Sequence, residues 1–230
     1  MMPKVIVHSS ISLDNAVTGF DIDIELHYGR LHSLSPDAVL VGSTTARTGI
    51  EMFLDAAMPE ALEDMKHPLP VAGDTRPLGI FVDSTGALLN RLHFYRRMEH
   101  IRDVIVLISE ATPPGYVAYL REREYPFIVC GREKVDIAKA CRIIGEAYGI
   151  SCIVSESGRD LNDHLIQEQI ADEISLLLTP VIAGPGGKRL FATVQAPVAL
   201  DLFDLEDLGK GRVHLRYRVV KKDVVTGGSE

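Results

Sequence analysis

The stretch "KVDIAKACRIIGEAYGISCIVSESGRDLNDHLIQEQIADEISLLLTPVIAG", residues 134–184, decides the fold class. Its first part, 134–150, has apolar residues at 137, 138, 141, 144 and 147, which is a helical period, and Gly149 supplies a stop. Because strands and helices that alternate are typical of a sheet covered on both faces, the stretch predicts an α/β protein. The elements predicted after the first helix are a strand, a helix, and one long strand or two: 151–155, 161–169 and 173–184.

The rest of the chain continues this alternation. Residues 43–53 are predicted as a polar loop that opens a helix. Near the end, residues 212–222 alternate polar with apolar side chains, which indicates a half-exposed strand. Strands that follow one another there without helices indicate an antiparallel edge hairpin on a mostly parallel central sheet. Further strands are predicted over 4–13, 37–42, 78–86, 103–109 and 126–131, and further helices over 21–35 and 115–123.

No repeat and no clear boundary divides the chain. We expect a single domain over 1–224 and a flexible tail over 225–230. Residues 55–77 are rich in proline, alanine and methionine. This composition is typical of a long connection or a mobile flap.

The composition limits the possible partners. The chain has 230 residues, of which 46% are hydrophobic and 24% charged, as in ordinary globular proteins. The formal net charge of −8 argues against general binding to nucleic-acid phosphates. No apolar run reaches the roughly 18 residues that span a bilayer. The first residues also lack the pattern of a secretory signal. We therefore expect a cytoplasmic protein with no nucleic-acid or membrane partner.

Cysteine and histidine give no metal motif. Cys130, Cys141 and Cys152 are odd in number and too far apart for a metal knuckle, so they are interpreted as structural thiols. His27 and His32 fall about 140° apart on a helix, which is a poor arrangement for a shared metal. They are interpreted as ordinary helix residues, and no metal is expected.

Small or polar residues follow several predicted strands. In open α/β sheets, ligands bind outside the carboxyl ends of the strands, so these segments could converge on one crevice. The alternative is that each glycine after a strand only makes a turn. The four segments are "HSSISLDN" (8–15), "VGSTTART" (41–48), "VDSTG" (82–86) and "SESGRDL" (155–161).

The segment "SGRDLNDHL", 157–165, begins a helix directly after a strand. Backbone N–H groups at such a start bind anions, and Gly158 would let a phosphate approach closely. The alternative is a capping role for Asp160 or Asn162, and the two readings are compatible. The chain has no GxGxxG, no GxxxxGK[ST] and no GxSxG pattern, so a standard dinucleotide fingerprint, a Walker site and a serine nucleophile elbow are all disfavoured.

Taken in order, "ISLDN" (11–15), "DAVLVGSTTART" (37–48), "IFVDSTG" (80–86) and residues 134–191 resemble the reductase family of riboflavin biosynthesis. This family is a dihydrofolate-reductase-like domain that stands alone in archaea and is fused to a deaminase in bacteria. The resemblance implies a three-layer α/β/α fold, NADPH as cofactor and a homodimer. It also implies a phosphoribosylamino-pyrimidine substrate, whose opened ribose accepts hydride at C1′ and becomes a ribityl chain.

The same resemblance implies roles for individual residues. Asp14 and Glu156 correspond to acids expected to be catalytic and to contact substrate, with a turn cap as the alternative for Asp14. Ser10 is expected beside the cofactor, Thr45 at its nucleotide part, and residues 158–162 at its phosphates. The full set of expected cofactor-binding residues is Ser10, Gly42, Ser43, Thr45, Ser84, Ser157, Gly158, Arg159, Asp160, Leu161 and Asn162.

The chain also departs from the family pattern. Ser157 replaces a glycine, and Asn15 replaces another, where asparagine can adopt the left-handed conformation. The family's aspartates after the second motif and its arginine near Ser33 are missing, and these residues grip the phosphoribosyl group. Two alternatives therefore stay open: an NADPH reductase of a different ring or carbonyl compound, and a non-catalytic ligand-binding relative. The 2′-phosphate that distinguishes NADPH from NADH needs a cationic partner. The candidates are Arg47, Arg132 and Lys134, and their spacing singles out none of them, so the choice between the two cofactors stays open.

Overall fold

The computed structural model describes residues 1–53, 58–69 and 71–221. The strands in these residues form one sheet in the order β5-β4-β3-β2-β6-β1-β7-β9-β8. Neighbours from β5 to β7 pair in parallel, and β9 pairs antiparallel with both β7 and β8. This confirms the predicted parallel sheet with an antiparallel C-terminal edge hairpin. The strands are β1 (Lys4–Ser12), β2 (Ala38–Gly42), β3 (Leu78–Val82), β4 (Val104–Ile108), β5 (Phe127–Val129), β6 (Cys152–Ser155), β7 (Glu173–Thr179), β8 (Leu200–Gly209) and β9 (Arg212–Val219).

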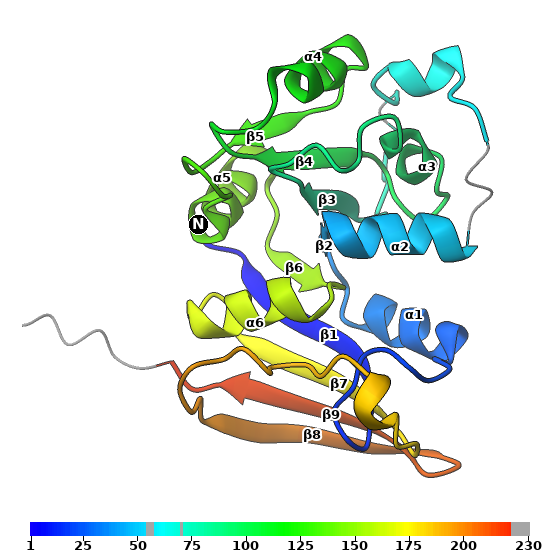
Figure 1. The fold of residues 1–230 in the computed structure, drawn as a ribbon, viewed down its shortest axis with the longest axis vertical. Helices are drawn as coiled ribbons and strands as arrows, with labels where there is room; N and C mark the ends of the chain where they lie inside the picture. Colours follow the sequence, from blue (N-terminus) through cyan, green and yellow to red (C-terminus); the bar gives the residue numbers. More distant parts are fainter. Residues whose placement is uncertain (54–57, 70, 222–230) are drawn as a thin grey trace, which may run out of the picture.

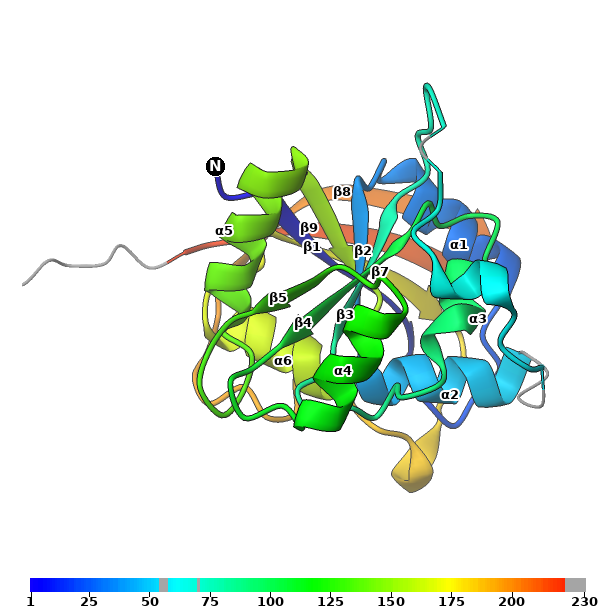
Figure 2. The same ribbon diagram turned by 90° about the horizontal axis from the view of Figure 1, so that it is seen from above.

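Helices cover the sheet on both faces, which gives the predicted three layers (Figures 1 and 2). Helices α5 and α6 lie on one face, and α1 to α4 lie on the other. The helices are α1 (Ile24–Ser33), α2 (Ser43–Phe53), α3 (Leu92–Arg96), α4 (Pro114–Glu122), α5 (Ile137–Tyr148) and α6 (Arg159–Gln167), with 3-10 turns η1 (Leu62–Met65) and η2 (Gly184–Gly186).

Alternate side chains of each central strand pack into two separate hydrophobic cores. Val5 and Val7 of β1 pack in the core under α5 and α6, while Ile6 between them packs in the core under α1 to α4. Successive side chains of a strand point to opposite faces, so a strand buried on both faces needs a continuous apolar run. Each such side chain contributes about 1.5–3 kcal/mol through burial.

Capping residues set the ends of two predicted helices. Asp23 accepts the N–H of Leu26 at 3.1 Å before α1, and Asp136 accepts that of Lys139 at 2.9 Å before α5. Helix α5 stops at Gly149, which is left-handed at φ +67°, as the sequence predicts.

The structure also differs from the sequence expectations. Residues 43–53 are helical throughout, as α2. The strand predicted over 173–184 is wrong beyond Thr179, because Pro180 has no N–H and the chain turns there into η2. Helix α3 and the mostly exposed strand β8 had no clear sequence pattern. The predicted tail, 225–230, and residues 55–57 and 70 of the predicted flap lie outside the described residues, and the single domain over 1–224 stays a prediction.

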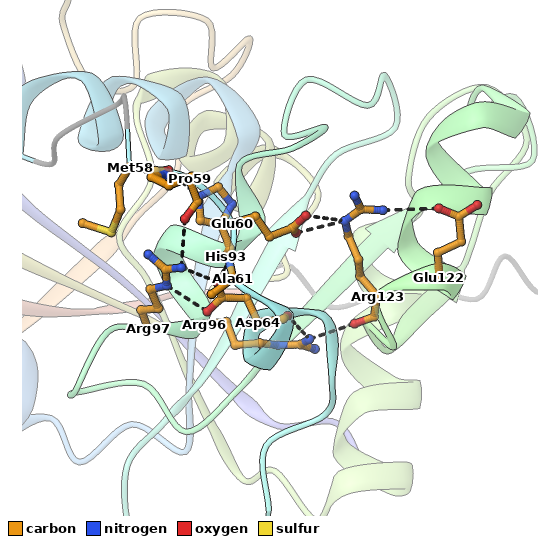
Figure 3. Close-up of polar contacts among 10 residues, drawn as sticks. All are labelled: Met58, Pro59, Glu60, Ala61, Asp64, His93, Arg96, Arg97, Glu122 and Arg123. Atoms are coloured by element: carbon orange, nitrogen blue, oxygen red, sulfur yellow. Dashed lines mark hydrogen bonds and ion pairs between the residues drawn. The ribbon is translucent and has the colours of Figure 1, made fainter.

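Arginine side chains hold residues 59–64 of the predicted flap, and Figure 3 shows these contacts. One of the arginines, Arg96, also bonds Asp103 at 3.1 Å, directly before β4. Arg97 forms a two-pronged pair with the buried carboxylate of Asp64, and Arg123 bonds both oxygens of Glu60 at 2.9 Å. Arg96 donates to the carbonyls of Asp64 and Arg123, each at 2.8 Å. Since Arg123 precedes β5, this segment lies at the opposite edge from the carboxyl ends of the strands.

Candidate functional site

The carboxyl ends of β1, β2, β3 and β6 lie at one edge of the sheet, which we call the rim. These strands are parallel, and β1, β6, β2 and β3 are neighbours in that order. Hydrogen bonds join the predicted segments after β2 and β6 directly. Ser84, after β3, instead bonds through its carbonyl to Thr112 at 3.0 Å, in the loop after β4.

The junction between β2 and β6 is closed by Ser157 and Thr45. The N–H of Gly42 donates to Ser157 Oγ at 3.0 Å, and that hydroxyl donates to the carbonyl of Leu40 at 3.2 Å. The N–H of Gly158 donates to Thr45 Oγ1 at 3.0 Å. A Cβ atom on Gly158 would lie 3.3 Å from the same oxygen, which is a tight contact. Ser157, a departure from the family pattern, is therefore a link between two strand ends.

Helix α6 begins at this junction without a side-chain cap. Its N-cap is Gly158, so the sequence alternative of a cap by Asp160 or Asn162 is wrong. Asp160 is exposed and bonds Arg159 Nε at 3.0 Å. An uncapped helix start, with its N–H groups and positive dipole end, fits a phosphate. Leu161 is half-buried in the first turn, and Ser43 is half-buried where α2 begins.

Asn162 is fully buried and supports the junction through hydrogen bonds of its side-chain amide. Its Nδ2 donates to the carbonyl of Ser157 at 2.7 Å and to Ser9 Oγ at 3.4 Å, while its Oδ1 accepts from Ser155 Oγ at 2.7 Å. One amide therefore ties β1, β6 and the start of α6 together. Its place in the structure is under the loop that would face a phosphate.

Glu156 and Ser10 meet at the ring of His27, which comes from α1. Ser10 Oγ lies 2.9 Å from His27 Nδ1, and His27 Nε2 lies 3.6 Å from Glu156 Oε1. The His27 side chain is only 10% exposed, whereas that of Glu156 is 23% exposed and reaches the rim. His27 is a residue of α1, as interpreted, but it is buried and its ring lies between Ser10 and Glu156, which the sequence did not indicate.

The aromatic side chains of Tyr28, Tyr95 and His100 interact electrostatically with the carboxylate of Glu156, and sequence reasoning missed them too. Burial first, and then the Glu156 charge, raise the pKa values of Tyr28 and Tyr95 above the usual tyrosine range. Burial lowers the pKa of His100, and Glu156 opposes that change. Tyr95 also donates to the carbonyl of Ala46 at 2.6 Å, which fixes α3 against α2. The carboxylate thus lies among uncharged rings, an environment suited to a planar ligand.

Asp14, after β1, has its carboxylate engaged by a loop near the C-terminal hairpin. It accepts from Ser12 Oγ at 2.6 Å and from the N–H groups of Ala183 and Gly184 at 2.9 and 3.0 Å. These bonds, the Ser12 hydroxyl first, lower the pKa of Asp14 to about 2. The neighbouring Asn15 is left-handed at φ +62°, as the sequence predicts.

The described residues contain no group of three or more His, Cys, Asp or Glu side chains placed to hold a metal ion. In the same part of the chain, no helix has the length and apolar character needed to cross a membrane. Arg47, one candidate partner for a 2′-phosphate, lies in α2, where its Nη2 atom is 3.7 Å from Oε1 of Glu51.

Comparison with known proteins places these features in a family. The profile described as RibD C-terminal domain matches residues 3–214. The 2,5-diamino-6-ribosylamino-4(3H)-pyrimidinone 5′-phosphate reductase of Methanothermobacter thermautotrophicus is 26% identical over 190 residues, which cover 80% of this chain and 81% of that relative.

Solved structures share the fold. A pyrimidine reductase-like protein from Corynebacterium diphtheriae has a TM-score of 0.73 at 18% identity, over 96% of this chain and 93% of its own. The riboflavin biosynthesis reductase of Saccharomyces cerevisiae has a TM-score of 0.64 at 19% identity, over 95% and 90%. These likenesses confirm the predicted dihydrofolate-reductase-like fold. Because the matched residues run from β1 into β9 and include every strand end of the rim, the chain belongs to the RibD C-terminal domain family.

Proposed function

We propose that this protein is an NADPH-dependent reductase of riboflavin biosynthesis. Its substrate would be 5-amino-6-(5-phosphoribosylamino)uracil or the related 2,5-diamino-6-(phosphoribosylamino)pyrimidinone, whose ribosyl group becomes ribityl. The arrangement of groups at the rim is the observation that best supports the proposal. There, an uncapped helix start suited to phosphate follows directly after a carboxylate set among aromatic rings. The name of the Methanothermobacter relative supports the same substrate class.

The residues of the rim fit a nicotinamide dinucleotide. The N–H groups of Arg159, Asp160 and Leu161 begin α6 and are suited to its phosphates. Thr45 and Ser157 hold that loop in place, and Asn162 supports it from below. When bound, the reduced cofactor supplies a hydride. Ser10, Gly42, Ser43 and Ser84 complete the proposed cofactor-binding set.

The protein groups position the reacting atoms and exclude water. We assign Glu156 to the substrate, because it is the carboxylate that reaches the rim beside the uncharged rings. Asp14 would orient substrate through the loop it holds at Ala183 and Gly184. The proposal also includes a homodimer and a cytoplasmic location, which rest on the family resemblance and on composition.

The test is a titration followed by an assay. The chain has no tryptophan, so NADPH and NADH fluorescence can be followed without an overlapping tryptophan signal. We expect NADPH to bind at micromolar concentration, the range of typical Michaelis constants, and to be oxidised when the phosphoribosylamino-pyrimidine is added. Binding without oxidation would favour a reductase of a different ring or carbonyl compound. No binding at all would favour a non-catalytic relative.

A further inference from the structure

A chain of buried polar side chains leads from the C-terminal hairpin to the rim. His214 Nε2 of β9 lies 2.8 Å from Ser175 Oγ of β7, which lies 2.9 Å from His8 Nδ1 of β1. His8 Nε2 in turn lies 3.2 Å from the carbonyl oxygen of His27. All four side chains are buried. Such a series needs an explanation, since polar groups in a core must each find a partner.

The direction of these hydrogen bonds follows from the carbonyl at the end of the series. Burial first, and then the neighbouring His27, lower the pKa of His8 to about 3, so its ring is neutral near pH 7. A carbonyl only accepts, so His8 carries its proton on Nε2 and accepts at Nδ1 from Ser175. Ser175 then accepts from Nε2–H of His214. This series of hydrogen bonds therefore holds the backbone carbonyl of His27 in place.

The two partners of the His27 ring, Glu156 and Ser10, also indicate which of its nitrogens carries the proton. An ionised carboxylate only accepts, and Glu156 Oε1 faces His27 Nε2 at 3.6 Å. This distance is long for a hydrogen bond, but the carboxylate still favours a proton on the nitrogen it faces. A ring whose only proton is on Nε2 accepts at Nδ1, so the hydroxyl of Ser10 would donate to it across 2.9 Å.

We infer that His27 is a positioning residue that orients the Glu156 carboxylate and takes the proton of Ser10, so that the carboxylate and Ser10 Oγ are both left to accept hydrogen bonds from a ligand. This end of the rim would therefore take the N–H-bearing edge of an aminopyrimidine ring. The inference rests on the proposed function and deepens it, because it assigns ring recognition to a residue on α1. A ring edge with only acceptors would set its lone pairs against those of Ser10 Oγ and the Glu156 carboxylate, which is strongly unfavourable in a partly buried site.

The first test uses the protein without cofactor, so it does not depend on reductase activity. In protein labelled with 15N-histidine at pH 8, we expect the His27 Nδ1 resonance in the unprotonated range and the Nε2 resonance in the protonated range. Titration with 2,4-diaminopyrimidine should shift the His27 ring resonances. Titration with 2,4-dimethoxypyrimidine, which has the same ring without N–H donors, should not. A protonated Nδ1 in the free protein, or an equal response to both pyrimidines, or to neither, would overturn the inference.

The second test separates positioning from folding. His27→Gln replaces a rigid ring, whose two nitrogens face Ser10 and Glu156, with an amide whose oxygen and nitrogen sit on one carbon, so it no longer holds both partners in the same geometry. His32→Gln is the matched control on an exposed histidine of the same helix. We expect His27→Gln to raise KM for the pyrimidine substrate about tenfold, the size typical of an unpaired polar contact, and His32→Gln to leave it within about twofold. An unchanged KM in a folded His27→Gln protein contradicts the inference. Absence of turnover in the unsubstituted protein would instead contradict the proposed function and leave the histidine spectra to decide the inference.

Discussion

Thr45 Oγ1 accepts the backbone N–H of Gly158 at 3.0 Å and so joins the first turn of α2 to the N-cap of α6. The two residues are 113 positions apart in the chain. This bond sets the position of the helix start that we propose to hold cofactor phosphate. It also uses the N–H of Gly158, which leaves phosphate binding to the N–H groups that follow.

Removing this bond should weaken cofactor binding. We expect Thr45→Val, which keeps the shape of the side chain, to raise the Kd for NADPH roughly fivefold, the equivalent of one lost hydrogen bond of about 1 kcal/mol. Fluorescence titration measures the change. Thr48→Val is the control, because Thr48 is exposed on the same helix and its hydroxyl donates to the carbonyl of Thr44 in that helix at 3.1 Å. Equal affinities of Thr45→Val and the control would show that the junction does not matter for binding.

Glu156 should act on turnover rather than on cofactor affinity. We expect Glu156→Ala to lower kcat by about 10²-fold or more, as for other groups that orient a reacting substrate or move a proton, while the Kd for NADPH changes less than about threefold. Steady-state rates and a cofactor titration on the same preparation measure both. Glu168→Ala, on an exposed residue just after α6, is the control. An equal loss in both quantities would place Glu156 with the cofactor.

Asp14 should contribute to stability in acid. Hydrogen bonds lower its pKa in the folded protein from 3.8 to about 2. A depressed pKa means that its contribution is fully present above the unfolded pKa and is lost as pH falls through the folded pKa. We therefore expect the free energy of unfolding to fall less steeply between pH 4 and pH 2 in Asp14→Asn than in the unsubstituted protein. Urea unfolding at several pH values measures this, with Asp21→Asn, exposed in the same loop, as control. Parallel pH curves would rule out the contribution.

The arginine cluster of Figure 3 should matter for folding but not for chemistry. Arg97→Ala leaves the buried Asp64 carboxylate without its main partner, so we expect a loss of roughly 2 kcal/mol in unfolding free energy, below the range for fully buried pairs because Arg97 is partly exposed. Arg121→Ala is the control, since Arg121 is exposed and its guanidinium lies over Phe127, 5.8 Å from the ring centre. The kcat of folded Arg97→Ala should stay within about twofold of the unsubstituted value, because the cluster lies at the amino edge. A large fall in kcat would mean that residues 58–66 communicate with the rim.

The sequence was most informative where one element carries its own pattern. The helical period of α5 and its stop at Gly149 could be predicted from local residues, as could the apolar run of β1. The strand ends that form the rim could be predicted too, because parallel strands place their carboxyl ends at one edge. These features depend on neighbours in the chain, so a single sequence contains them.

The contacts within the rim could not be predicted in the same way. The contacts of His27 with Ser10 and Glu156 form only because α1 packs over the ends of β1 and β6. The spacing of residues within α1 does not indicate these contacts. The bonds from Ala183 and Gly184 to Asp14 cross 169 and 170 positions of the chain. Each of these contacts depends on tertiary packing, which local pattern does not encode.

Transfer of a labelled hydride tests the central claim most directly. The protein is incubated with NADPH that carries deuterium at C4 of the nicotinamide, on each face in turn, and with the phosphoribosylamino-pyrimidine, and the product is analysed by mass spectrometry. The account predicts one deuterium at C1′ of a ribityl product from one of the two labelled cofactors. A ribityl product without deuterium from either cofactor, or no product although NADPH is bound, would contradict it.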